Sequence, residues 1–286
     1  MLLAVPNVSE GRDHALIERL AGSFGALRVL DVHSDPDHGR SVLTFAGKQS
    51  EVADGLLQGA CAAVAAIDLN RQQGMHPRVG ALDVAPVVYL DPLDRGAAIA
   101  EALTAAALIG DELELPVFLY GALADGRERA EIRAGGRDGL ARRMSAGEIT
   151  PDYGPGELHP SAGAVLVTAR PPLVAFNVDL ESDDLELAQE LAAELRESGG
   201  GPAGVRAIGL FLAERGRAQV SFNVHSFGAA PLAQLVERIR ERAPIAEAEL
   251  VGLAPRAALE GFPDDVRLRG FSPERHVIEE ALQAVE

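Results

Sequence analysis

The order of predicted elements repeats in the two halves of this chain, and this repeat constrains the fold more than any other feature. In the first half, apolar periodicity predicts strand, helix, strand, strand, helix and strand, over residues 2–8, 13–24, 27–32, 41–46, 50–67 and 81–90. In the second half, the same periodicity predicts the same series of elements, over residues 173–180, 182–197, 205–213, 217–225, 231–242 and 248–253. The first strands also match, Val5-Pro6-Asn7-Val8 against Ala175-Phe176-Asn177-Val178.

This series is the split βαβ pattern, so we expect an α+β protein of two ferredoxin-like subdomains, each a sheet with helices on one face. Residues 1–168 and 169–286 are the predicted subdomains, with the boundary near residues 167–170. A further helix and strand, at 95–109 and 116–120, extend the first half. Ser182 is the predicted N-cap of the helix at 182–197. Small ligands commonly bind between domains, which favours a ligand groove between the two halves.

Composition excludes several functional classes. The formal charge of −17 argues against a nucleic-acid partner, because binding phosphates requires clustered basic residues. The N-terminus lacks a signal-peptide pattern, and no apolar run approaches the ~20 residues of a membrane span. A single cysteine, Cys61, excludes a disulfide within the chain. We therefore expect a cytoplasmic protein that does not bind membranes.

The segment from Gly74 to Pro86 carries the most distinctive polar residues. Pro77 keeps His76 extended, and the flanking glycines allow close backbone approach. His76 can exchange a proton near neutral pH, and Arg78 can bind a carboxylate with two parallel hydrogen bonds. A capping histidine and a solvated arginine would satisfy the same pattern. Asp83 stands in an otherwise apolar strand and needs a partner, for which Arg78 or His76 is the nearest candidate.

A second polar cluster lies between the strands at 27–32 and 41–46. His33, Asp35, Asp37 and His38 fall within six residues, and His with carboxylate suits zinc or manganese. The same residue types are ordinary in turns, and no paired ligand motif such as H-E-x-x-H occurs. A polar turn and a ligand-facing loop remain open, and we predict no metal site.

Three motifs together resemble the formiminotransferase domain family. They are Val5-Pro6-Asn7-Val8-Ser9-Glu10-Gly11, the His76 segment, and the segment from Gly154 to Gly163, in the family's order. The resemblance extends over nearly the whole chain and implies a stand-alone member without a cyclodeaminase portion. It implies transfer of a formimidoyl group from N-formimidoyl-L-glutamate to tetrahydrofolate, with the folate as co-substrate, and a homodimer.

The resemblance also implies roles for particular residues. His76 would be the acid/base catalyst. The family's folate-binding segment corresponds to Gly154, Pro155, Gly156, Glu157, Leu158, His159, Pro160, Ser161, Ala162 and Gly163. Weaker substrate-binding candidates are Asp37, Arg40, Arg78, Asp83 and Asn223.

Two features set this chain apart from the family pattern. The family usually has Asn where this chain has Gly39, and its folate tunnel is basic whereas this chain is acidic. A basic tunnel mouth would require that the arginines at 127, 129, 133, 137, 142 and 143 gather together. The alternatives are a folate-binding relative without catalysis and a metal-dependent hydrolase that uses the His33–His38 cluster.

Overall fold

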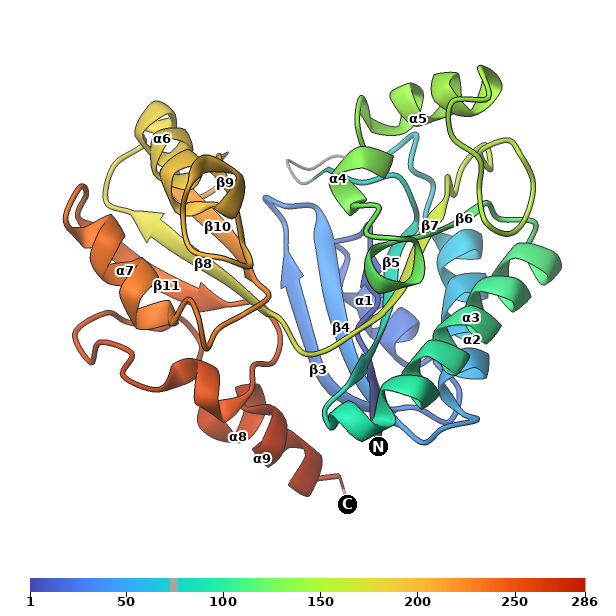
Figure 1. Cartoon of the computed structure of the whole chain (residues 1–286), viewed down its shortest axis with the longest axis horizontal. Coiled ribbons are helices and arrows are strands. Elements are labelled where there is room, and N and C mark those ends of the chain that lie inside the picture. The colour runs from blue at the N-terminus through green and yellow to red at the C-terminus, as the bar shows by residue number, and fades with distance from the viewer. Residues whose placement is uncertain (73–76, 286) are drawn as a thin grey trace. The chain divides into compact units, whose positions relative to one another are not determined.

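The computed structural model describes residues 1–72 and 77–285. The chain divides into two compact units, Met1–Pro171 and Pro172–Glu286 (Figure 1). His76, the predicted catalytic residue, lies outside the described residues. In the described ranges, none of the helices is both long and apolar enough to cross a membrane.

The first unit is built on one sheet. Its strands are β1 (Leu2–Ala4), β2 (Asn7–Val8), β3 (Arg28–Asp35), β4 (Arg40–Gly47), β5 (Leu82–Tyr89), β6 (Val117–Leu119) and β7 (Val165–Arg170). The short strands β1 and β2 both pair with β4 on one side and β5 on the other, and β3 pairs with β4. Strands β7 and β6 extend the sheet beyond β5 by parallel pairing.

Helices cover both faces of this sheet, although the sequence pattern predicted only one. Helices α1 (His14–Ala21), α2 (Val52–Ala66) and α3 (Arg95–Glu112) bury the main core (Figure 1). Gly59 on α2 allows close packing against Phe24, because a Cβ at this position would lie 2.1 Å from the Phe24 ring. The short helices α4 (Arg129–Ile132) and α5 (Gly136–Ser145) pack on the other face of the β5–β7–β6 extension.

The second unit repeats the arrangement without the extension. Its antiparallel sheet has the order β11 (Ile245–Leu250), β8 (Val174–Leu180), β10 (Arg217–Val224) and β9 (Val205–Leu212). Helices α6 (Leu185–Leu195) and α7 (Leu232–Arg240) cover one face, and α8 (Pro273–His276) and α9 (Ile278–Gln283) close the chain. The strand order corresponds to β5, β1/β2, β4 and β3 of the first unit, which confirms two split βαβ subdomains.

The boundary predicted near residues 167–170 lies next to the division of the chain after Pro171. The residues just before it form β7, a strand that was not predicted and that lies between β5 and β6. Because β7 is buried on both faces, its apolar run does not alternate. The predicted N-cap of α6 was wrong: the N-cap is Asp184, whose side chain accepts a hydrogen bond from Leu187 N at 2.9 Å, and not Ser182.

Candidate active site

Asp83 anchors the segment that follows His76 in the sequence. Its carboxylate accepts the backbone N–H groups of Val79 at 2.7 Å and Gly80 at 3.2 Å. It also forms an ion pair with Arg133, which follows α4, and both side chains are nearly buried. The sequence analysis named Arg78 or His76 as the partner. The Arg78 guanidinium donates to the carbonyl oxygen of Gly39 at 3.2 Å and interacts with Asp83 through its charge, and His76 lies outside the described residues. A partner 50 residues away cannot be identified from local spacing.

A register shift of β5 against β2 places Asp83 at this position. Asn7 lies opposite Val84, whereas its neighbour Val8 lies opposite Leu82. Strand β5 therefore has one residue more than β2 at this point, which is a β-bulge. A bulge changes the face of the sheet to which a side chain points. Asp83 is the additional residue, so a carboxylate reaches the face on which α4 and α5 pack.

The β3–β4 hairpin brings a second set of predicted residues to the same place. His33 and Asp35 belong to β3, so the connection is only the four-residue turn from Pro36 to Gly39. Asp35 closes this turn by accepting the backbone N–H of His38 at 2.8 Å. His33, Asp35 and His38 are therefore parts of a hairpin, not of a long loop.

The backbone conformation of Gly39 shows why glycine can replace the family's usual asparagine in this turn. Its φ is +64°, in the left-handed region that glycine and asparagine adopt most readily. The backbone of the turn thus accommodates either residue, and the substitution removes a side chain without changing the path of the chain. Asp37, in the same turn, is 5% exposed.

Three segments far apart in the sequence meet at one small pocket. Its lining residues come from the first motif, from the hairpin turn and from the segment after His76; they are Asn7, Val8, Ser9, His38, Arg40, Arg78 and Asp83. The first motif is tied to the third by Ser9, whose hydroxyl donates to the carbonyl oxygen of Gly80 at 2.7 Å. The pocket joins the predicted residues Arg40, Arg78 and Asp83, which lie 38 and 5 residues apart in the chain.

Positive charge accumulates around this pocket. The pKa of Arg40 is lowered to about 10, mainly by burial. The positive charges of Arg133 and Arg129 lower it as well. Asp83 and Asp35 act in the opposite direction but do not compensate.

We define the arginine cluster as Arg40, Arg78, Arg129, Arg133 and Arg170. Burial lowers the pKa of Arg78, and it lowers the pKa of Arg170 to about 10. A chain of net charge −17 thus collects guanidinium groups in one region of its first unit. Arg133 pairs with Asp83, and the charges of Asp83 and Asp35 offset part of the repulsion at Arg40. An anionic ligand would offset more of this repulsion, so the cluster is compatible with a carboxylate-bearing ligand.

The arginines of residues 127–143 do not all join this cluster. Arg127 pairs with Asp152, and Arg137 donates to Asn70 and Pro160. Arg143 donates to two carbonyl oxygens at the end of α4 and to that of Ala134 just after it. Arg129 and Arg133 are the members of this run whose charges act on Arg40. The arginine-rich run in an acidic chain was a usable sequence signal, but it could not show which arginines converge.

The predicted folate segment lies inside the first unit, between α5 and β7, and is not a linker at a domain seam. Its second half is fixed against the segment after His76: Ala81 N donates to Ala162 O at 2.8 Å and Ala164 N to Val79 O at 3.0 Å. Gly163 has φ +72°, and a Cβ there would lie 1.9 Å from Val79 O. By contrast, residues 154–157 are exposed to solvent.

His159 stabilises the turn in this segment. Its Nδ1 accepts the backbone N–H of Ala162 at 3.0 Å. Pro160 contributes its carbonyl oxygen, which accepts from Arg137 at 2.8 Å and from Asn70 at 3.1 Å. The segment is therefore held from three sides and presents a defined conformation.

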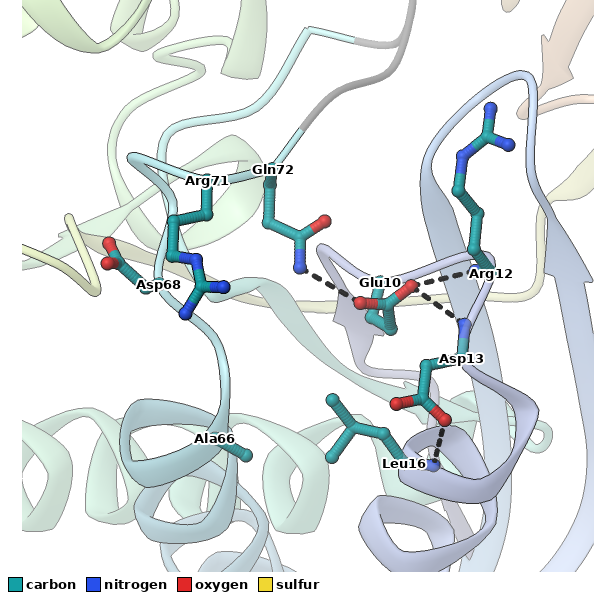
Figure 2. A pocket seen from close by; sticks show the side chains of 8 residues that line it. All are labelled: Glu10, Arg12, Asp13, Leu16, Ala66, Asp68, Arg71 and Gln72. Carbon is teal, nitrogen blue, oxygen red and sulfur yellow. Dashed lines mark hydrogen bonds between the residues drawn. The ribbon is translucent and has the colours of Figure 1, made fainter.

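Glu10 of the first motif organises a second, larger pocket of about 400 Å³. One carboxylate oxygen accepts the backbone N–H groups of Arg12 at 2.7 Å and Asp13 at 3.1 Å, and the other accepts Gln72 Nε2 at 2.9 Å (Figure 2). Asp13 in turn caps α1 by accepting Leu16 N at 2.9 Å. Burial raises the pKa of Glu10, but these hydrogen bonds lower it more, and the net pKa is lowered. The first motif is thus connected to the loop that leads towards His76.

Asn223 lies in the other unit, half-buried on β10 and opposite Ala175 of β8. The buried polar residues of that sheet form a network of their own. Asn177 donates to Glu249 at 3.3 Å, and Gln219 donates to Asp179 at 2.6 Å. Burial raises the pKa of Asp179, and the hydrogen bond from Gln219 opposes this.

Comparison with known proteins assigns the family. Residues 1–170 match the N-terminal subdomain of the formiminotransferase domain, and residues 175–262 match the formiminotransferase domain. The chain is 37% identical over 266 residues to a glutamate formimidoyltransferase of Streptococcus pyogenes serotype M1, covering 89% of both chains. It is 33% identical over 269 residues to one of Thermoplasma acidophilum, covering 89% of this chain and 88% of that one.

A longer protein matches as well. The formimidoyltransferase-cyclodeaminase of Sus scrofa is 37% identical over 276 residues, and 50% of its length is covered. The chain therefore belongs to the formiminotransferase domain family.

Proposed function

We propose that this protein transfers the formimidoyl group of N-formimidoyl-L-glutamate to tetrahydrofolate, which releases L-glutamate and forms 5-formimidoyltetrahydrofolate. The observation that carries the proposal is the arginine cluster, two members of which, Arg40 and Arg78, line the pocket where the first family motif, the β3–β4 turn and the segment after His76 meet. The proposed donor bears two carboxylates, which a set of desolvated guanidinium groups would bind strongly. Relatives that match almost end to end are named glutamate formimidoyltransferase.

Arg40 and Arg78 are the proposed ligands of a donor carboxylate. Both line the small pocket, and both have a pKa lowered by burial, so an incoming anion would restore favourable interactions that water no longer supplies. Asp37, buried in the hairpin turn, is a proposed further substrate contact. Asn223 is also proposed as a substrate-binding residue, and only its match to an asparagine of the family supports this.

The reaction requires one proton to be taken and one to be returned. N5 of tetrahydrofolate attacks the amidine carbon, a tetrahedral species forms, and the bond from that carbon to the glutamate nitrogen breaks. A base takes the N5 proton, and the same group as acid protonates the departing amine. We propose His76 for both steps, because an imidazole of pKa near ~6.5 can act in either direction.

The backbone next to His76 supports this role. Pro77 follows it directly, and the N–H groups of Val79 and Gly80 are held by Asp83. A loop fixed so close to the catalytic residue can keep an imidazole aligned with two substrates, and alignment contributes much of the rate of such transfers. No metal is required for these proton transfers.

We propose that residues 154–163 bind the folate. Ala162 accepts a hydrogen bond from Ala81, and Gly163 forms a β-bridge with Gly80, so a folate held by this segment would lie near the segment that follows the proposed base. The exposed residues 154–157 are available for contact. We also propose that the protein is a cytoplasmic homodimer that works without metal, as the family resemblance implies.

The test is a donor panel with tetrahydrofolate as acceptor. Purified protein is incubated with N-formimidoyl derivatives of glutamate, aspartate and glycine, and the free amino acid and the formimidoyl-folate are both quantified by chromatography. Stoichiometric formation of both products from the glutamate derivative is the expected result. Folate binding without either product would instead assign a non-catalytic relative, and activity that EDTA abolishes and zinc or manganese restores would assign a metal-dependent enzyme.

A further inference from the structure

Asn7 is a buried residue whose side-chain amide has no hydrogen-bond partner in the protein. It is 8% exposed, and within residues 1–72 and 77–285 no hydrogen bond involves this amide. Asn7 also forms part of a strand, β2, although asparagine is depleted in strands. Buried polar side chains are nearly always paired in folded proteins, so an amide without a partner calls for a functional explanation.

The pairing of β2 shows why the amide has no partner. Asn7 lies opposite Val42 of β4 and Val84 of β5, and neither valine side chain can donate or accept a hydrogen bond. Its neighbour Val8 belongs to the core that α1, α2 and α3 bury. Because successive side chains of a strand alternate, the amide of Asn7 points to the other face of the sheet, the face that the carboxylate of Asp83 also reaches.

The second unit contains the equivalent position with a partner. Asn177 stands in the matching segment, in β8, and lies opposite Ser221 of β10 and Glu249 of β11. Its amide donates to the carboxylate of Glu249 at 3.3 Å. Since β11 is the counterpart of β5 in the strand order, Glu249 stands where the first unit has Val84. The first unit thus keeps the asparagine but lacks the side chain that would satisfy it.

Asn7 lines the small pocket of Arg40 and Arg78. Guanidinium groups are only donors, so the pocket offers a ligand several donors. The carboxylate of Asp83 already accepts two backbone N–H groups and forms the ion pair with Arg133. No hydrogen bond fixes the amide of Asn7, so its Oδ1 can turn towards a ligand. The amide oxygen is therefore an acceptor that a ligand N–H group can use.

We propose that Asn7 binds the formimidoyl group of the donor substrate through its Oδ1 and so selects N-formimidoyl substrates over other dicarboxylates. This inference rests on the proposed function and deepens it, because it names a residue that recognises the transferred group. An amidine carries N–H groups in both its neutral and its protonated form, and arginines cannot accept hydrogen bonds from them. A neutral amide suits this position better than a carboxylate, since an acid would pair with Arg40 or Arg78 and compete with the donor's own carboxylate.

The experiment compares a ligand that has the formimidoyl group with one that lacks it. Dissociation constants are measured by isothermal titration for N-formimidoyl-L-glutamate and for glutarate, which has the same carbon chain and both carboxylates but no nitrogen. Asn7→Leu should weaken binding of N-formimidoyl-L-glutamate by about 5- to 50-fold, the worth of one or two hydrogen bonds. The affinity for glutarate should change less than about twofold. Asn7→Ala should give the same contrast, which separates the loss of the amide from the bulk of leucine.

A stability measurement distinguishes recognition from a structural role. Replacing a buried amide that has no partner removes no hydrogen bond, so Asn7→Leu should keep or raise the midpoint of urea unfolding, followed by circular dichroism. Asn177→Leu is the matched control. It removes a hydrogen bond to Glu249, which is 7% exposed, and should lower the midpoint.

Equal losses for the two ligands, or no loss for N-formimidoyl-L-glutamate, would overturn the inference. A midpoint lowered as much by Asn7→Leu as by Asn177→Leu would assign Asn7 to the fold instead. Because the readout is binding, it remains separate from the proposed activity. A wild-type protein that distinguishes the two ligands through Asn7 but transfers no formimidoyl group would contradict the activity and leave the recognition by Asn7 standing.

Discussion

Replacing Asp83 by Asn tests whether this carboxylate holds the segment after His76 in place. Asp83 accepts two backbone N–H groups and the Arg133 ion pair while its side chain is only 6% exposed. Asparagine keeps the size and one acceptor oxygen, so the packing is preserved. What is lost is the negative charge, and Arg133, 11% exposed, is left nearly buried without it.

The expected cost follows from that geometry. Removing one partner of a buried ion pair typically costs 3–5 kcal/mol, and the remaining amide oxygen places Asp83→Asn near the lower end, at about 3 kcal/mol. The double variant Asp83→Asn with Arg133→Met removes the stranded charge and should be less destabilised than the sum of the two single variants, by about 1–3 kcal/mol. Asp152→Asn is the matched control, because the Arg127–Asp152 pair is 25% and 31% exposed and should cost about 1 kcal/mol or less.

Urea unfolding followed by tyrosine fluorescence is the assay. The chain has no tryptophan, and its three tyrosines, Tyr89, Tyr120 and Tyr153, all lie in the first unit, so the signal reports that unit alone. A loss for Asp83→Asn that is no larger than the loss for Asp152→Asn would refute the anchoring role. Additive single variants would show that the two side chains are not energetically coupled.

Three other perturbations have definite expected outcomes. His76→Ala should lower kcat by ~10²–10⁴ with folate affinity retained, measured by steady-state kinetics and titration, and a variant that keeps more than about a tenth of kcat would demote His76 to a positioning residue. Gly163→Ala should destabilise the first unit by at least about 2 kcal/mol, because the backbone of Gly163 is left-handed and a methyl group there would collide with Val79 O. As a control, Gly156→Ala has open space around the new methyl group and should change the unfolding free energy by no more than about 0.5 kcal/mol in the same urea assay. Because the pKa of Glu10 is lowered, its carboxylate stabilises the fold at neutral pH, and this contribution is lost as the pH falls through the folded-state pKa, below 4.5. The difference in unfolding free energy between wild type and Glu10→Gln should therefore shrink in that range. A difference that grows on acidification would contradict the assigned hydrogen bonds.

Much of the fold could be predicted because its signals are local. Apolar periodicity marked most strands and helices to within a few residues, and the repeated order of elements predicted two split βαβ units. Two elements that were not predicted lack such a local signal. Strand β7 is buried on both faces and does not alternate, and α4 is only four residues long, too short for a helical period to appear.

For the site as well, some residues could be predicted from local sequence and others could not. His76, Arg40, Arg78 and the segment at 154–163 could be nominated from motifs, since a motif is a run of neighbouring residues. Gly39 was identified from the sequence only as a departure from the family's usual Asn, and its positive φ shows that glycine suits the backbone of the turn.

By itself, the sequence determined which residues can carry charge or a proton and the order in which the elements follow one another, because composition and periodicity belong to the chain. Only the tertiary structure decided which charges lie together. Arg133 pairs with Asp83 across 50 residues, and Arg170 meets Arg129 at Tyr120, because parallel pairing of β5, β7 and β6 brings the ends of distant strands to one edge of the sheet. The cost of burying a charge depends on everything that surrounds it in space, and those surroundings exist only once the chain has folded.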